Sequence, residues 1–110
     1  MIFTNSNKSL KSPEFQAVIV EAILQSCITG SYIYELIEII ERIIPSPYNT
    51  LRKYLFHLIN YELISYNGQK QIYTIREEGI HLLDWIKREK IIMAVSSEDF
   101  IITIEKNFLY

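Results

Sequence analysis

The segment from Ser46 to Ile64 constrains the fold of this chain more than any other, because it combines a helix start with a long amphipathic pattern. Ser46 suits the N-cap position and Pro47 suits the first helical position. Apolar residues then recur at helical spacing and make one face, and they are Leu51, Tyr54, Leu55, Leu58 and Ile59. The other side carries Asn49, Lys53, Phe56 and Asn60, flanked by Arg52 and His57. The segment therefore predicts a helix that is buried on one side and presents basic and amide groups on the other.

Directly after this helix, the apolar residues change from helical spacing to alternation. Ile64 and Tyr66 alternate with Ser65, Tyr73 and Ile75 alternate with Ile72 and Thr74, and Asn67-Gly68 lies between the two runs. Asn-Gly between alternating runs is a strong signal for a β-hairpin. A loop of two or four residues puts all four apolar side chains on one sheet face, whereas three residues would split them. We therefore predict a two-stranded hairpin with an even loop.

Three further helices are predicted around this centre. Ser12-Pro13-Glu14 is a helix start, and the apolar pattern behind it runs to about Ile28, where Gly30 ends the helix. Ser31 can cap a second helix, which presents Ile33, Leu36, Ile37, Ile40 and Ile44 on one face. A last helix is expected from about Glu78 to Met93.

The two ends of the chain carry weaker patterns. Residues 1–11 show no period, so a loose N-terminal arm is expected there, before a domain over residues 12–95. In the tail, residues 96–110, Ser96-Ser97-Glu98-Asp99 is a helix start signal, whereas the β-branched run from Ile101 to Ile104 favours a strand. We expect a helix in the tail.

Composition places the chain among ordinary globular proteins. Of its 110 residues, 49% are hydrophobic and 22% are charged, which predicts one folded domain. Cys27 is the single cysteine, so neither an intrachain disulfide nor a cysteine metal cluster is possible. No signal peptide is evident and charged residues interrupt every apolar run before it reaches the length of a membrane span, so we expect a cytoplasmic protein.

Positive charge is concentrated in the centre of the chain. The formal net charge is −2, but residues 45–76 contain four basic residues and one acidic residue, Glu62, which gives that segment +3. The four are Arg52, Lys53, Lys70 and Arg76. A local basic excess on one helix and the following hairpin favours a polyanionic partner.

The predicted order of three helices, a hairpin and a fourth helix resembles the winged helix-turn-helix domain, and most closely the small archaeal winged-helix transcriptional regulators. The resemblance lies in Leu51-Arg-Lys-Tyr-Leu55, Leu63-Ile64, Tyr73-Thr-Ile75 and Gly79. Two positions depart from it: Arg76 replaces the usual Thr before the last helix, and Glu62 replaces the usual Gly before Leu63. The implied fold is mostly α with a small β-hairpin, comprising three helices, a two-stranded wing, and a C-terminal helix and tail.

The resemblance implies a regulator of transcription that binds double-stranded DNA, with the central helix in the major groove and the wing on the backbone. The implied contact residues are Tyr48, Asn49, Arg52, Lys53, Phe56 and His57 on the helix, and Gln69, Lys70 and Gln71 on the wing. Phe56 either touches a thymine methyl group or marks a protein-binding patch. Glu35, Glu38 and Glu41 on the second helix would repel phosphate. The alternative is therefore a winged-helix protein–protein interaction module without DNA binding.

No catalytic pattern accompanies these features. The sequence has no Ser-His-Asp order and no Gly-rich phosphate loop, and its two histidines, His57 and His81, lie far apart without a cysteine partner. We therefore expect no enzyme activity, no metal and no cofactor.

Self-association is expected through the last helix and the tail. The helix is apolar on two sides, more than one small core can cover, and the tail adds further apolar residues. The predicted homodimer contacts are Leu82, Ile86, Met93, Phe100, Ile104 and Phe108. The competing arrangement is a monomer whose tail folds back over its own helices.

Overall fold

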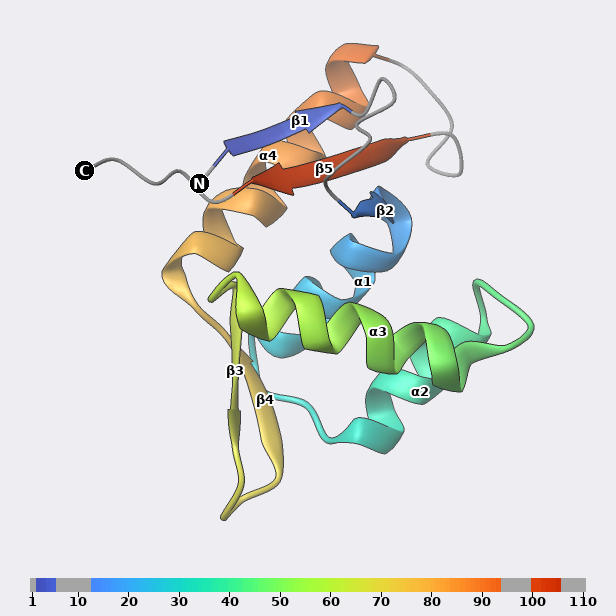
Figure 1. The fold of residues 1–110 in the computed structure, drawn as a ribbon, viewed down its shortest axis with the longest axis vertical. Coiled ribbons are helices and arrows are strands. Elements are labelled where there is room, and N and C mark those ends of the chain that lie inside the picture. Colours follow the sequence, from blue (N-terminus) through green and yellow to red (C-terminus); the bar gives the residue numbers. More distant parts are fainter. Residues whose placement is uncertain (1, 6–12, 94–99, 106–110) are drawn as a thin grey trace.

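The computed structural model describes residues 2–5, 13–93 and 100–105, which form a mostly helical fold with two small sheets (Figure 1). The helices are α1 (Ala17–Cys27), α2 (Ile33–Glu41), α3 (Pro47–Asn60) and α4 (Glu77–Met93). The strands are β1 (Ile2–Asn5), β2 (Glu14–Gln16), β3 (Ile64–Asn67), β4 (Ile72–Ile75) and β5 (Ile101–Glu105). The sequence predicted the four helices and the hairpin formed by β3 and β4.

The three-stranded sheet joins both ends of the described chain and was not predicted. Its order is β1-β5-β2, all antiparallel, with Phe3 opposite Ile104 and Phe15 opposite Ile102. The helix expected in the tail is therefore wrong over Ile101–Glu105, and the loose arm is wrong over Ile2–Asn5. The β-branched run of β5 suits an extended strand, and neighbours on both sides satisfy its backbone groups. The predicted helix start at residues 96–99 lies outside the described residues.

The same sheet shortens the first helix. We expected it to begin at the Ser12-Pro13-Glu14 signal, but Glu14–Gln16 pair with β5 and α1 begins at Ala17. The backbone N–H of Gln16 donates to the Tyr54 hydroxyl at 2.8 Å, and that of Ala17 donates to the Phe100 carbonyl at 2.8 Å. These bonds take up amides that a longer helix would have used. The helix ends at Cys27, and Gly30 turns the chain with a φ of 87°.

The start of α2 also differs from the prediction. Tyr32, not Ser31, is the N-cap residue, and its backbone N–H donates to the Glu35 carboxylate at 2.8 Å. Ser31 instead forms a β-bridge with Tyr73, through N–H···O bonds of 2.9 and 2.8 Å in both directions. This bridge fixes the hairpin beside the segment that leads into α2.

The central helix α3 begins at Pro47 as predicted, with Ser46 at the N-cap position, although the Ser46 side chain makes no capping bond. The helix ends in a Schellman motif. In it, Leu63 N–H donates to the Leu58 carbonyl and Glu62 N–H donates to the Ile59 carbonyl, both at 2.9 Å. Glu62 adopts a φ of 61°, the left-handed conformation that favours glycine.

The hairpin has the predicted pairing. Ile64 lies opposite Ile75 and Tyr66 opposite Tyr73, and the two tyrosine rings are 4.6 Å apart between centroids. Asn67 pairs with Ile72, so residues 68–71 form the loop, one of the two even lengths expected. The Asn67 side-chain oxygen accepts the backbone N–H groups of Gln69 and Lys70 at 3.0 and 3.1 Å.

The last helix, α4, packs against α1 and contributes to the common core. Leu82 and Ile86 are fully buried there, as are Phe100 and Ile104 of the tail segment. Trp85 contacts both Phe3 and Phe100, with ring centroids 5.9 and 5.8 Å apart. These packing contacts within the chain replace the predicted dimer contacts of Leu82, Ile86, Phe100 and Ile104. The Met93 side chain and Phe108 lie outside the described part, and dimerisation itself stays a prediction.

Candidate functional site

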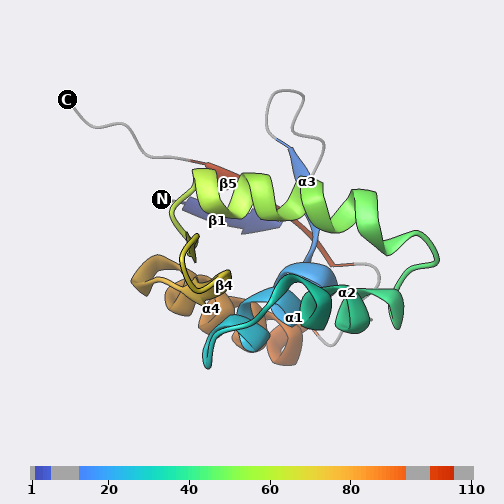
Figure 2. The ribbon, with the colours of Figure 1, turned by 90° about the horizontal axis from the view of Figure 1, so that it is seen from below.

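The outward face of α3 is the most distinctive surface of the described chain. Leu51, Tyr54, Leu55 and Leu58 are buried, which fixes the rotation of the helix. Figure 2 shows α3 on one side of the molecule, with α1, α2 and α4 together on the other side. The predicted contact residues on the helix are exposed, apart from the half-buried His57; they are Tyr48, Asn49, Arg52, Lys53 and Phe56.

Two of these residues interact along one stripe of the helix. Tyr48, Arg52 and Phe56 are four residues apart in turn, so they lie above one another on the same face. The Arg52 guanidinium lies over the Tyr48 ring, 5.8 Å from its centroid. This cation–π contact orients the guanidinium while its N–H donors remain exposed.

His57 has a packing role instead of a charged one. Its ring lies 5.4 Å from that of Phe15, 5.3 Å from that of Phe56 and 6.2 Å from that of Tyr61. Burial, and next to it the positive charge of Lys53, lower the pKa of His57 below its ordinary value. His57 is therefore neutral near neutral pH and adds no positive charge to the face.

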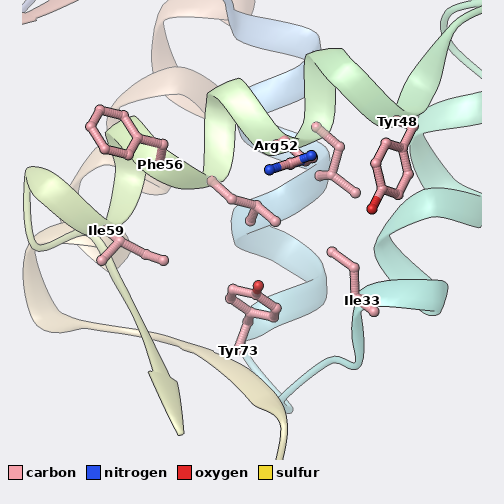
Figure 3. A pocket seen from close by; sticks show the side chains of 8 residues that line it. Ile33, Tyr48, Arg52, Phe56, Ile59 and Tyr73 are labelled. Atoms are coloured by element: carbon pink, nitrogen blue, oxygen red, sulfur yellow. The ribbon is translucent and has the colours of Figure 1, made fainter. Parts of the chain in front are cut away.

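A groove runs beside α3, between this helix, the start of α2 and the hairpin (Figure 3). We call it the α3 groove; it is lined by Ile33, Tyr48, Leu51, Arg52, Leu55, Phe56, Ile59 and Tyr73. Its volume is about 450 Å³. Arg52 is the one charged residue among those lining residues, and the others are aliphatic or aromatic. Such a groove suits a flat, apolar group that carries negative charge nearby.

Beside the α3 groove lies a second hollow of about 290 Å³, and Ile33 and Tyr73 line both. We call this hollow the tyrosine extension; it is lined by Tyr32, Ile33, Tyr34, Tyr66, Gln71 and Tyr73. Tyr32 and Tyr34 stack with 5.5 Å between ring centroids and 6° between ring planes. Neither hollow has an acidic lining residue.

The hairpin loop separates the predicted wing residues. Gln69, Lys70 and Gln71 are all exposed, and the bonds to Asn67 hold the loop in one shape. Gln71 reaches the tyrosine extension, whereas Lys70 lines a different hollow together with Thr29 and Tyr66. The α3 groove therefore brings together Tyr48, Arg52 and Phe56, whereas Gln71 and Lys70 each line a different hollow.

The acidic residues predicted to oppose an anion lie on α2. Glu38 and Glu41 are exposed, while the Glu35 carboxylate accepts the backbone N–H of Tyr32. No acidic residue occurs in α3 itself. The negative charge is thus on the neighbouring helix and not on the face that carries Arg52 and Lys53.

The sequence analysis missed the far wall of the groove. Ile33 and Tyr73 come from segments distant in sequence, and the Ser31–Tyr73 bridge brings them to α3. The sequence held one indication of this wall. Tyr32 and Tyr34, at the start of α2, are aromatic residues that a fully buried helix would not require.

Comparison with protein-family models finds no matching family, and comparison with curated proteins finds no match either. Over the residues that the structure describes, no group of three or more His, Cys, Asp or Glu residues is placed to hold a metal ion. Within the same residues, no helix has both the length and the apolar character needed to cross a membrane.

Proposed function

We propose that this protein is a DNA-binding regulator of transcription with a winged helix-turn-helix domain, in which α3 enters the major groove of duplex DNA. The observation that carries the proposal is the outward face of α3, where Asn49, Arg52 and Lys53 are exposed on a helix without acidic residues. A helix that is packed on one side and polar on the other fits the width of the major groove. The element order of α2, α3 and the β3–β4 hairpin supports this reading.

The exposed side chains of α3 suit readout of base edges. Arg52 offers paired donors that match the acceptors of guanine, and Asn49 offers the donor and acceptor that match adenine. Lys53 lies beside them and would contact phosphate, which strengthens binding to every sequence alike. Arg52 is oriented over Tyr48, so it loses less conformational freedom when it binds.

The hairpin would follow the DNA backbone. Its exposed loop carries Lys70 as the cation, with Gln69 and Gln71 on either side as hydrogen-bond donors. These contacts position the protein and carry no sequence information. The carboxylates of α2 favour an approach in which DNA meets α3 and the hairpin before it meets Glu38 and Glu41.

A second function, docking of a protein partner, is favoured by one observation. Phe56 is 64% exposed beside the apolar α3 groove, which is more aromatic surface than base-edge readout requires. If a protein partner docks on Phe56 and the α3 groove, Arg52 and Lys53 would lie at the edge of the interface. Removing these two residues would then not abolish binding of the partner.

Fluorescence polarisation tests the proposal, with a labelled duplex whose preferred sequence is first selected from a random-sequence pool. Arg52→Ala should weaken binding to a preferred sequence by about 5- to 150-fold if Arg52 reads a base. Arg88→Ala is the matched control, because Arg88 is an exposed arginine on α4 whose recorded ion pair is with the equally exposed Asp84. Equal affinity of the wild type, the Arg52 variant and the control would contradict DNA binding through α3.

A further inference from the structure

We propose that the α3 groove binds unpaired bases of single-stranded nucleic acid, which stack on the aromatic rings along it. This inference rests on the proposed function, because it assigns a second form of nucleic acid to the same surface of α3. In addition to double-stranded DNA, the protein would bind a single strand whose bases are unpaired.

The rings that border the groove are exposed and come from separate elements. Phe56 and Tyr48 are 64% and 55% exposed on α3, and eight residues along a helix separate them by about 12 Å. Tyr34 on α2 and Tyr66 on β3 add exposed rings around the tyrosine extension. Because the two hollows share the lining residues Ile33 and Tyr73, these rings border neighbouring hollows on one side of the molecule.

Exposed rings of this kind match unpaired bases better than paired ones. In a duplex the faces of the bases are covered by the neighbouring bases, so a protein can reach only the edges of the bases. In a single strand every base has a free face, and stacking on an aromatic side chain stabilises binding with any sequence. Reading duplex DNA would use Arg52 and Asn49 but leave most of this aromatic surface without a partner.

Charge selects a nucleic acid over a protein segment as the occupant. Arg52 projects into the α3 groove in Figure 3, and no carboxylate lines the groove or its extension. Lys53 is exposed on the same helix. The phosphates of a strand would be complementary to Arg52 and Lys53, whereas an apolar peptide would use the apolar wall and leave Arg52 unpaired.

The proposal is tested with the full chain by fluorescence polarisation, using labelled oligothymidylate and a mixed-sequence duplex of the same length. Phe56→Leu removes the ring but keeps an apolar side chain, and Phe56→Tyr keeps the ring. Ile92→Ala is the control, because Ile92 is an exposed apolar residue on α4 outside the groove. Thermal unfolding of each variant shows that it is folded.

The wild type should bind oligothymidylate, and Phe56→Leu should weaken that binding by about 5- to 150-fold, as loss of one stacked base requires. Phe56→Tyr and Ile92→Ala should bind oligothymidylate like the wild type. This pattern supports the inference. If the same pattern is found but no duplex binds, the proposed function is contradicted and the inference stands.

Three results would overturn the inference. If the duplex binds and oligothymidylate does not, the groove takes no unpaired bases and the proposed function stands. If Phe56→Leu leaves the affinity for oligothymidylate unchanged, the ring faces some other partner, such as a protein. Failure of both nucleic acids to bind the folded protein would remove the inference and the proposed function together.

Discussion

Replacing Gly79 by alanine should destabilise the protein strongly, because the first turn of α4 lies directly against the end of α3. A Cβ atom at Gly79 would be 2.1 Å from the Leu63 carbonyl oxygen and 2.8 Å from Cγ1 of Ile75. The Leu63 carbonyl also accepts the backbone N–H of Arg76 at 2.9 Å. The new methyl group would therefore push on a backbone atom that cannot move without breaking this bond.

The magnitude follows from three contributions to the free energy of unfolding. Forcing a methyl group into a closed site costs about 3 kcal/mol when the obstacle is backbone. Loss of the Arg76–Leu63 hydrogen bond costs about 1 kcal/mol, and the better helix propensity of alanine returns about 1 kcal/mol. The expected net loss is about 3 kcal/mol, which for a domain of this size lowers Tm by roughly 10–20 °C.

Urea unfolding followed by circular dichroism measures this loss, with Gly68→Ala as the matched control. At Gly68 the nearest atom to a new Cβ is Cε2 of Tyr66 at 3.8 Å, an ordinary contact, so this variant should stay within about 0.5 kcal/mol of the wild type. If Gly79→Ala were as stable as Gly68→Ala, the close approach of α4 to Leu63 would be wrong.

Three further predictions concern stability. Glu62→Gly should stabilise the protein by up to about 1 kcal/mol in urea unfolding, because Glu62 has a φ of 61°, and a decrease would contradict this. Tyr54→Phe should cost about 1–2 kcal/mol, because it removes the hydroxyl that accepts the Gln16 N–H, and an unchanged urea midpoint would argue against that bond. Burial raises the pKa of the Cys27 thiol from 9.0 to about 12, so the folded state favours the neutral thiol. Stability should therefore fall by about 1.4 kcal/mol per pH unit as pH rises above 9, and Cys27→Ala should flatten that slope in unfolding experiments at several pH values.

Local patterns in the sequence predicted the helices and the hairpin well. The pairing of Tyr66 with Tyr73 follows from alternation and an even loop, both contained within a dozen residues. The start of α3 follows from Pro47, and its buried face follows from the helical spacing of Leu51, Leu55 and Leu58.

The three-stranded sheet was missed because its strands are far apart in the sequence. The neighbours of β5 lie at the other end of the chain, and neither Ile2–Asn5 nor Glu14–Gln16 is long enough to show alternation. The Ser12-Pro13-Glu14 signal was therefore assigned to the helix that begins three residues after Glu14, at Ala17. The fully buried Phe100 and Ile104 then complete the protomer core, which left less apolar surface for a dimer than the sequence had indicated.

The candidate site was predicted only in part, because some of its residues also come from segments far apart in the sequence. Helical spacing placed Asn49, Lys53 and Phe56 on the outer face of one helix, with Arg52 beside them. The opposite wall depends on the bridge between Ser31 and Tyr73, which joins segments more than forty residues apart and leaves no local pattern.

The salt dependence of binding to a mixed-sequence duplex tests the central claim, that the α3 face and the hairpin bind nucleic acid through their cations. If Lys53 and Lys70 each neutralise one phosphate, log K should fall with log salt with a slope of about −2. The slope should become less steep by about one with Lys53→Ala and remain unchanged with Arg88→Ala. Absence of duplex binding at low salt by the folded protein, or a slope that Lys53→Ala does not alter, would contradict the account.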